Sequence, residues 1–213
     1  IYLHYVLDEW FTTIKSRHFR GRAELVRFAD DAVWVFQYPE DAKRFYAVLP
    51  KRLGKYGLKL HEEKSGLLRS GSKAAEQMEK RGKRLPTYKF LGFTCYWGRS
   101  LKGFYRLKYK SRSDRMTAKL KGLRQYLKTQ LARDTVRVVK QVGRVVRGWL
   151  NYHGISDNQK RADSFNILCK RILFNWVNRK GGKHPMNWPT FVKLLKRGNY
   201  PERFKTISMF TRF

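Results

Sequence analysis

LVRFADDAVWVF, residues 25–36, places two adjacent acids between two apolar runs. Branched and aromatic residues on both sides of a short polar step are typical of two strands joined by a tight turn. Asp is common in turns, so the two acids mark the turn itself. The sequence therefore predicts an antiparallel hairpin with Asp30 and Asp31 at its tip.

Two neighbouring carboxylates at a hairpin tip repel each other unless a cation lies between them. Mg²⁺ prefers hard oxygen ligands of this kind. Two-metal phosphoryl-transfer sites use such carboxylates to activate a 3′ hydroxyl and to neutralise the leaving pyrophosphate. The alternative is an Asp-Asp turn without chemistry. The dipeptide alone favours that alternative, and the rest of the chain reverses the preference.

The chain is strongly basic, and its charge is concentrated in the second part. It has 213 residues, with 48 Lys and Arg against 16 Asp and Glu and a formal net charge of +32. Residues 1–80 carry a net charge of +4, and residues 81–213 carry +28. Hydrophobic residues make up 42% of the chain, which argues against a disordered basic tail. A folded cationic body most often binds nucleic acid; the alternative is a basic surface that faces only solvent or a membrane.

Cysteine and hydropathy patterns argue against several other classes of protein. Cys95 and Cys169 are the only cysteines, and no Cys/His spacing suits zinc. We expect both to be small core residues in a reducing compartment. No apolar run approaches the roughly 18 residues of a membrane span. The expected location is the cytoplasm, in association with a nucleoid or a ribonucleoprotein.

Hydrophobic spacing predicts an α+β organisation in the first half of the chain and helices in the second. The elements expected before residue 111 are a helix over 1–17, the hairpin, a helix from Pro39 to about Gly57, short strands at 58–60 and 66–68, and a second hairpin over 88–110. Pro50 should break or kink its helix. The elements expected later are three helices up to residue 180, with Asp134 as a cap and Gly181-Gly182 as a stop, and a last helix over 189–197.

The second of these three helices carries charge on one face only. At 100° per residue, its apolar side consists of Val138, Val139, Val142, Val145, Val146 and Trp149, and its opposite side of Arg137, Lys140, Arg144 and Arg147. A continuous cationic stripe is what a helix laid along a phosphate backbone needs. The alternative is a solvated face, although such faces normally mix signs. Arg112, Arg115 and Lys119 at the start of the preceding helix extend the predicted nucleic-acid surface.

Four ordered segments resemble one known family. Residues 27–31, RFADD, resemble the Tyr-Ala-Asp-Asp box of reverse transcriptases. Residues 57–65, GLKLHEEKS, resemble the next block of bacterial group II intron proteins, and residues 90–93, FLGF, resemble the primer-grip block after it. Residues 146–152, VRGWLNY, resemble the maturase-specific thumb, also called domain X. The four segments span nearly the whole chain in the family's order.

This resemblance implies a right-hand polymerase of α+β class. Residues 1–110 would form the C-terminal part of the palm, an antiparallel sheet with helices, containing a linker at 69–86. Residues 111–180 would form an all-α thumb, a basic three-helix bundle, and residues 181–213 a tail with a short helix. The first helix begins without a cap, which indicates that a segment precedes Ile1. The resemblance implies that this segment holds the fingers and the family's first palm carboxylate. We therefore expect these 213 residues alone to be inactive as a polymerase.

The resemblance also implies roles for single residues. Asp30 and Asp31 would be catalytic and would ligate Mg²⁺ in a two-metal site, with Asp30 in the bridging position. The implied primer- and nucleotide-binding residues are Phe28, Ala29, Lys64, Leu91 and Gly92. Phe28 would pack on the primer-terminal sugar, and Gly92 would let the backbone approach the primer because it lacks a Cβ atom. Lys64 would hold the nucleotide region or a phosphate, unless it is a surface lysine.

The implied function is that of an RNA-directed DNA polymerase with maturase activity. Its partners would be structured intron RNA, an RNA template with a DNA primer, dNTP and target DNA. A second hypothesis is a non-catalytic maturase that only binds RNA and assists splicing. A third is a related reverse transcriptase in phage defence or beside CRISPR genes. No membrane partner is expected, and the sequence leaves the oligomeric state open.

Overall fold

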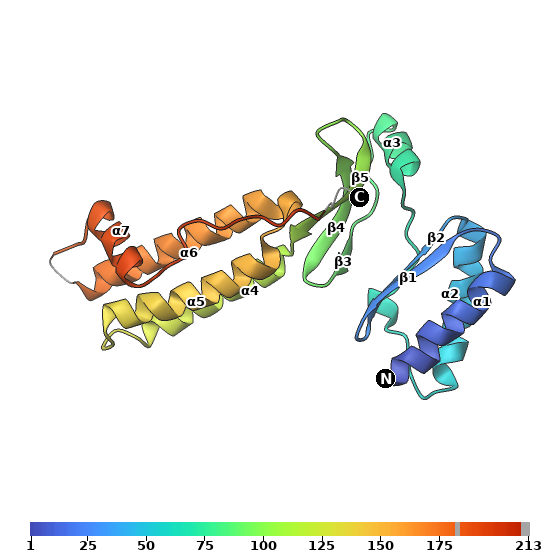
Figure 1. Cartoon of the computed structure of the whole chain (residues 1–213), viewed down its shortest axis with the longest axis horizontal. Helices are drawn as coiled ribbons and strands as arrows, with labels where there is room; N and C mark the ends of the chain where they lie inside the picture. Colours follow the sequence, from blue (N-terminus) through green and yellow to red (C-terminus); the bar gives the residue numbers. More distant parts are fainter. Residues whose placement is uncertain (182–183, 210–213) are drawn as a thin grey trace. The chain divides into compact units, whose positions relative to one another are not determined.

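The computed structural model describes residues 1–181 and 184–209, and the chain divides into two compact units. Unit 1 comprises Ile1–Pro86 and Arg99–Tyr105, and unit 2 comprises Thr87–Gly98 and Arg106–Phe213. Helices and small antiparallel sheets make up the fold, so the predicted α+β class is confirmed (Figure 1). In the part of the chain that the structure describes, no helix combines the length and the apolar character needed to cross a bilayer.

Unit 1 is built around the predicted hairpin. Its elements are η1 (His4–Glu9, a π-helix), α1 (Trp10–His18), β1 (Ala23–Phe28), β2 (Asp31–Phe36), α2 (Pro39–Gly54), η2 (Glu62–Lys64, a 3₁₀ turn) and α3 (Ser72–Lys80). The strands pair antiparallel from Ala23↔Phe36 to Phe28↔Asp31, which confirms the hairpin. Both α1 and α2 lie on one side of it (Figure 1). Its core-facing side packs on Phe11, Phe45 and Leu49 of these helices.

Three local expectations in unit 1 are wrong. The helix α2 continues through Pro50 to Gly54, because the buried Leu49 and Leu53 on either side hold it in the core. Residues 58–60 and 66–68 form no strands; Leu58 and Leu60 instead pack at the edge of the core. Nine residues of the expected linker at 69–86 form the helix α3.

Unit 2 joins a three-stranded sheet to a helical bundle. Its elements are β3 (Tyr88–Phe90), β4 (Phe93–Arg99), β5 (Tyr105–Ser111), α4 (Ser113–Lys128), α5 (Thr135–His153), η3 (Ser156–Asn158), α6 (Gln159–Lys180) and α7 (Trp188–Arg197), with the tip residues 99–105 of β4 and β5 grouped in unit 1. The sheet order is β3-β4-β5. The three helices predicted over 111–180 are present as α4, α5 and α6. Gly182, expected to end the third, lies outside the described residues.

The bundle is fixed by caps and by close backbone packing. Asp134 caps α5 as predicted, its Oδ1 accepting a hydrogen bond from Arg137 N at 2.7 Å. Val139 of α5 is fully buried and lies directly beneath Gly198 at the end of α7. The buried Asn158 ties the sheet to the bundle: its Oδ1 accepts from Ser111 N at 2.7 Å, and its Nδ2 donates to His153 O at 2.8 Å. The helices of unit 2 therefore share one hydrophobic core, and Asn158 joins the sheet to them through hydrogen bonds.

Candidate carboxylate hairpin and nucleic-acid interface

The predicted acids lie at an open, two-residue turn. Phe28 and Asp31 close the ladder, so Ala29 and Asp30 form the loop. Ala29 has φ +53°, a left-handed conformation that costs a non-glycine residue about 1–2 kcal/mol. Asp30 and Asp31 are exposed, and their carboxylates form no hydrogen bond or ion pair with residues 1–181 or 184–209. The chain thus holds two uncompensated carboxylates at one tip.

The arginine nearest the acids is engaged elsewhere. Arg27 donates to Asp8 of η1 through Nε (2.7 Å to Oδ1) and Nη2 (2.6 Å to Oδ2), and through Nη1 to the Ala29 carbonyl at 2.8 Å. The hydrogen bonds from Arg27 hold the pKa of the Asp8 carboxyl below its usual value. Arg27 therefore braces the strained turn without neutralising Asp30 or Asp31. Sequence reasoning missed Asp8, because nothing local relates it to the hairpin.

One face of the hairpin is open and largely apolar. Directly opposed residues share a face, so Phe28 and Asp31 lie on the same side as the pair Val26 and Val33. Phe28 is 66% exposed and Val26 54% exposed. The other face is the one that packs on α1 and α2. The predicted aromatic partner of the acids is therefore accessible beside Asp31.

Asp30 and Asp31 suit a hard divalent cation, but the described residues supply only part of its ligands. Two adjacent carboxylates offer the oxygen ligands that Mg²⁺ prefers. Across the described ranges, no three His, Cys, Asp or Glu residues gather in a metal-binding group. Lys64 is exposed at the end of η2, and its ammonium forms no ion pair with the described residues. Its role stays a prediction.

The other predicted primer-contact residues belong to unit 2, in the β3–β4 turn. Leu91 (φ +46°) and Gly92 (φ +75°) both have left-handed backbones. Tyr152 of α5 donates its hydroxyl to the Leu91 carbonyl at 2.8 Å. A Cβ atom at Gly92 would lie 3.6 Å from the Tyr152 ring and 3.8 Å from Nε2 of His153. The turn is thus seated on the end of α5, an arrangement that sequence reasoning missed.

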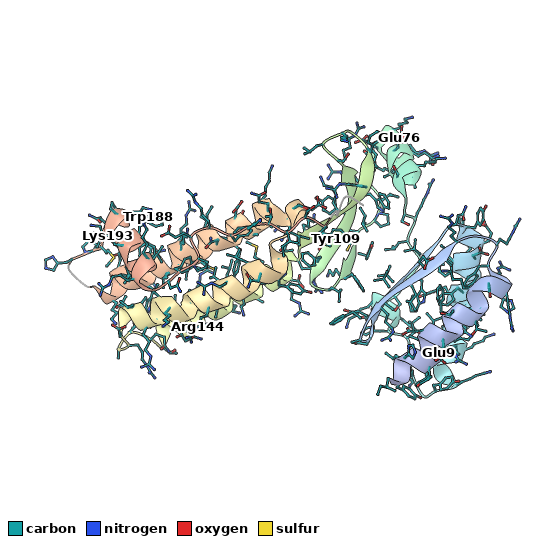
Figure 2. All side chains as sticks on the ribbon, in the orientation of Figure 1. Glu9, Glu76, Tyr109, Arg144, Trp188 and Lys193 are labelled. Carbon is teal, nitrogen blue, oxygen red and sulfur yellow. The ribbon has the colours of Figure 1, made fainter. Side chains whose placement is uncertain are left out.

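Most of the predicted cationic residues are exposed and unpaired. Within the described part of the chain, five form no ion pair: Arg115, Lys119, Arg137, Lys140 and Arg144. Arg144 extends from the exposed side of α5 (Figure 2). Arg112 instead pairs with Asp114 at 2.5 Å, which lowers the pKa of Asp114 to about 2. Arg147 donates to the Asn199 carbonyl at 2.9 Å, so its guanidinium is partly used within the protein.

Acids in unit 2 compensate little of this charge. Asp134 is engaged as the cap of α5, and Asp114 is paired with Arg112. Asp157 pairs with Arg106, whose Nη1 lies 2.7 Å from Oδ2. None of these three acids pairs with the cationic stripe of α5, so the stripe keeps its positive field.

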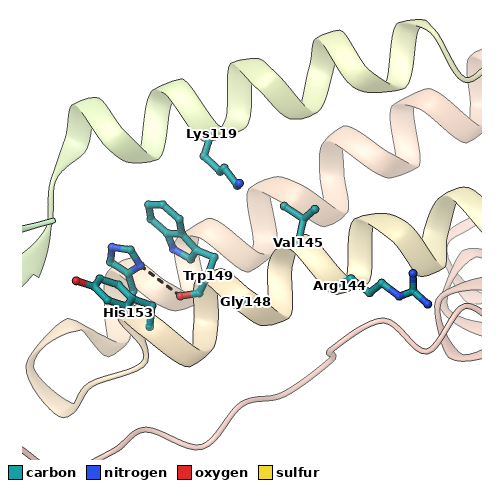
Figure 3. A pocket seen from close by; sticks show the side chains of 7 residues that line it. Lys119, Arg144, Val145, Gly148, Trp149 and His153 are labelled. Atoms are coloured by element: carbon teal, nitrogen blue, oxygen red, sulfur yellow. Dashed lines mark hydrogen bonds between the residues drawn. The ribbon is translucent and has the colours of Figure 1, made fainter.

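A cavity of about 370 Å³ lies between α4 and α5. The residues that line it are Lys119, Arg144, Val145, Gly148, Trp149, Tyr152 and His153. Lys119 reaches from α4 toward Trp149 and Val145 of α5 (Figure 3). Val145 and Trp149 belong to the apolar side of α5, but both are only half-buried because they line this cavity. Burial lowers the pKa of His153, which favours the neutral imidazole in the lining of this cavity.

Comparison with known proteins assigns the helical part of unit 2. Residues 113–190 match the family described as the group II intron, maturase-specific domain. The match runs from the start of α4 into α7. It supports a group II intron maturase-related protein. No curated protein matches the chain.

Proposed function

We propose that the protein is an RNA-directed DNA polymerase of the group II intron type, which binds structured intron RNA through unit 2. One observation carries this proposal: a chain with a maturase-specific bundle also presents two exposed, uncompensated carboxylates at a strained hairpin tip. A bundle that only binds RNA has no use for such a tip, because paired acids repel the phosphate backbone.

The hairpin residues have distinct roles in this proposal. Asp30 and Asp31 hold Mg²⁺, which when bound supplies Lewis-acid activation of a primer 3′ hydroxyl. The exposed ring of Phe28 packs on the primer-terminal sugar, beside Asp31 on the same face. Arg27 holds the strained two-residue turn at Ala29 in place, and the short turn leaves room for the primer to approach the acids. Lys64 holds a phosphate of the incoming dNTP.

The unit 2 residues position nucleic acid rather than perform chemistry. Leu91 and Gly92 present backbone to the primer from a turn anchored by Tyr152. The unpaired cations of α4 and α5 contact phosphates of the template duplex and of the intron RNA. Target DNA would use the same phosphate contacts.

The test replaces Asp30 and Asp31 by Asn in the full-length gene product. These substitutions keep side-chain size and remove charge at an exposed tip, so folding should be unchanged. Primer extension on an RNA template should be lost, while affinity for intron RNA should stay within about twofold, since no phosphate contact is removed. Glu40→Gln, at another exposed acid of unit 1, is the matched control and should keep both activities. Wild-type DNA synthesis by the Asn variant, or collapse of its RNA binding, would contradict the proposal.

A non-catalytic maturase is the second candidate. The observation in its favour is that the described residues supply two carboxylates and no third metal ligand. It predicts that wild type and the Asn variant support splicing equally and that neither synthesises DNA. Splicing and primer-extension assays on the same two proteins therefore separate the candidates.

A further inference from the structure

The cavity between α4 and α5 has an electropositive rim of two different cations. Lys119 comes from α4 and Arg144 from α5, and neither pairs with an acid in the ranges that the structure describes. Arg144 makes only a long contact, 3.5 Å, from Nη1 to Gln141 Oε1. Two unpaired cations that line one hollow favour the binding of an anionic group there.

The Trp149 ring that lines the cavity stacks on other rings of the protein. His153 stacks on the indole of Trp149 with ring centres 3.9 Å apart and an interplanar angle of 15°. Phe165 stacks on the same indole at 4.5 Å and 26°. Two rings of the protein therefore already stack on the Trp149 indole. Aromatic edges carry partial positive charge and attract oxygen atoms.

The floor of the cavity is open because residue 148 is glycine. Gly148 is exposed in the middle of α5, and no atom lies within 4 Å of the position that its Cβ would take. Glycine there costs about 0.5–1 kcal/mol relative to Ala. Gly122 of α4 is equally open but does not line this cavity, so it offers a matched control.

We propose that this cavity seats the phosphate and ribose of one nucleotide of the bound RNA. The phosphate lies between Lys119 and Arg144, and the ribose lies over Gly148 beside the edge of Trp149. This inference rests on the proposed RNA binding by unit 2, and it adds a specific backbone seat to a surface that otherwise attracts RNA by charge. Recognition at this seat is of the backbone, because two cations line it and the Trp149 indole already stacks on two rings of the protein.

The decisive variant is Gly148→Leu, which fills the floor and removes no charge. A phosphate kept away from Lys119 and Arg144 loses two contacts, so the slope of log K against log[salt] should fall by about 1.5 and affinity at 0.15 M salt by about tenfold. Gly122→Leu should change neither quantity. Both variants should melt no lower than wild type, since each replaces an exposed helical glycine by a better helix former. A purely long-range electrostatic surface would keep its full slope in Gly148→Leu.

Charge variants check the same seat independently. Lys119→Gln should lower the salt slope by about 1, whereas Lys121→Gln, two residues along α4 and outside the cavity, should have a smaller effect. The probe is a fluorescein-labelled RNA stem-loop, measured by anisotropy in the full chain. Unlabelled dNTP is the competing phosphate source and should not displace it.

The outcomes separate this inference from the proposed function. If the wild type binds the RNA stem-loop and Gly148→Leu behaves like Gly122→Leu, the seat does not exist, although RNA binding stands. Displacement of the RNA by dNTP would also overturn the seat, because the cavity would then hold a free nucleotide. If the wild type fails to bind RNA at all, the proposed function and this inference fall together.

Discussion

Removing the unpaired cations of α5 should lower the affinity for RNA and should also reduce the dependence of that affinity on salt concentration. The perturbation is the triple substitution of Arg137, Lys140 and Arg144 by Gln. All three side chains are exposed, and within the described part of the chain none of them forms an ion pair. Arg147 belongs to the same predicted stripe but donates to the Asn199 carbonyl, so it is left unchanged.

The size of the effect follows from the number of phosphate contacts. Each cation that neutralises a phosphate contributes about 0.7–0.9 to the slope of log K against log[salt]. Three contacts therefore contribute about 2–3, and their loss at 0.15 M salt should weaken binding about a hundredfold. Because the side chains are exposed, the free energy of unfolding should change by no more than about 0.5 kcal/mol.

The assay is fluorescence anisotropy with an intron-derived RNA stem-loop over a series of salt concentrations. The control is a second triple that removes the same charge from exposed positions of α6 and α7, namely Lys160, Arg171 and Lys196 replaced by Gln. It should alter the slope much less. Equal slopes for the two triples, or an unchanged slope in the α5 triple, would refute a specific role for this face.

Two further predictions concern the stability of unit 2. Gly198→Ala would place a Cβ 2.3 Å from Cγ1 of the fully buried Val139, so it should lower the free energy of unfolding by about 1–3 kcal/mol. Gly122→Ala, which has no atom within 4 Å of its Cβ, is the control and should raise the free energy of unfolding slightly. Denaturant unfolding measures both variants. Burial lowers the pKa of His153 below 6.5, so the unfolded chain binds more protons on acidification and stability falls as pH drops through 6.5. The stability difference between wild type and His153→Gln should therefore shrink between pH 7.5 and pH 5.5 in thermal melts, and a pH-independent difference would contradict this.

Local signals in the sequence were sufficient to predict the hairpin with its tip and the helices of unit 2, although not the irregular segments at 58–60 and 66–68. The register of β1 and β2 places Asp30 and Asp31 where the alternation and the turn residues predict, because a two-residue turn and its flanking strands depend on neighbours in the chain. The Asp134 cap and the buried valines at 138, 139, 142 and 146 follow helical periodicity in the same way. The roles of these residues in catalysis or RNA binding stay predictions.

Contacts between distant residues depended on tertiary structure alone. Pairing of Arg27 with Asp8, and of Tyr152 with the Leu91 carbonyl, joins segments that no short-range pattern relates. Pro50 shows the same limit, since packing of Leu49 and Leu53 keeps a helix that local propensity would end. Sequence periodicity identifies which side of a helix is apolar or charged, but it does not give the partners of that side. Packing supplies those partners, and it alone opened the cavity between α4 and α5.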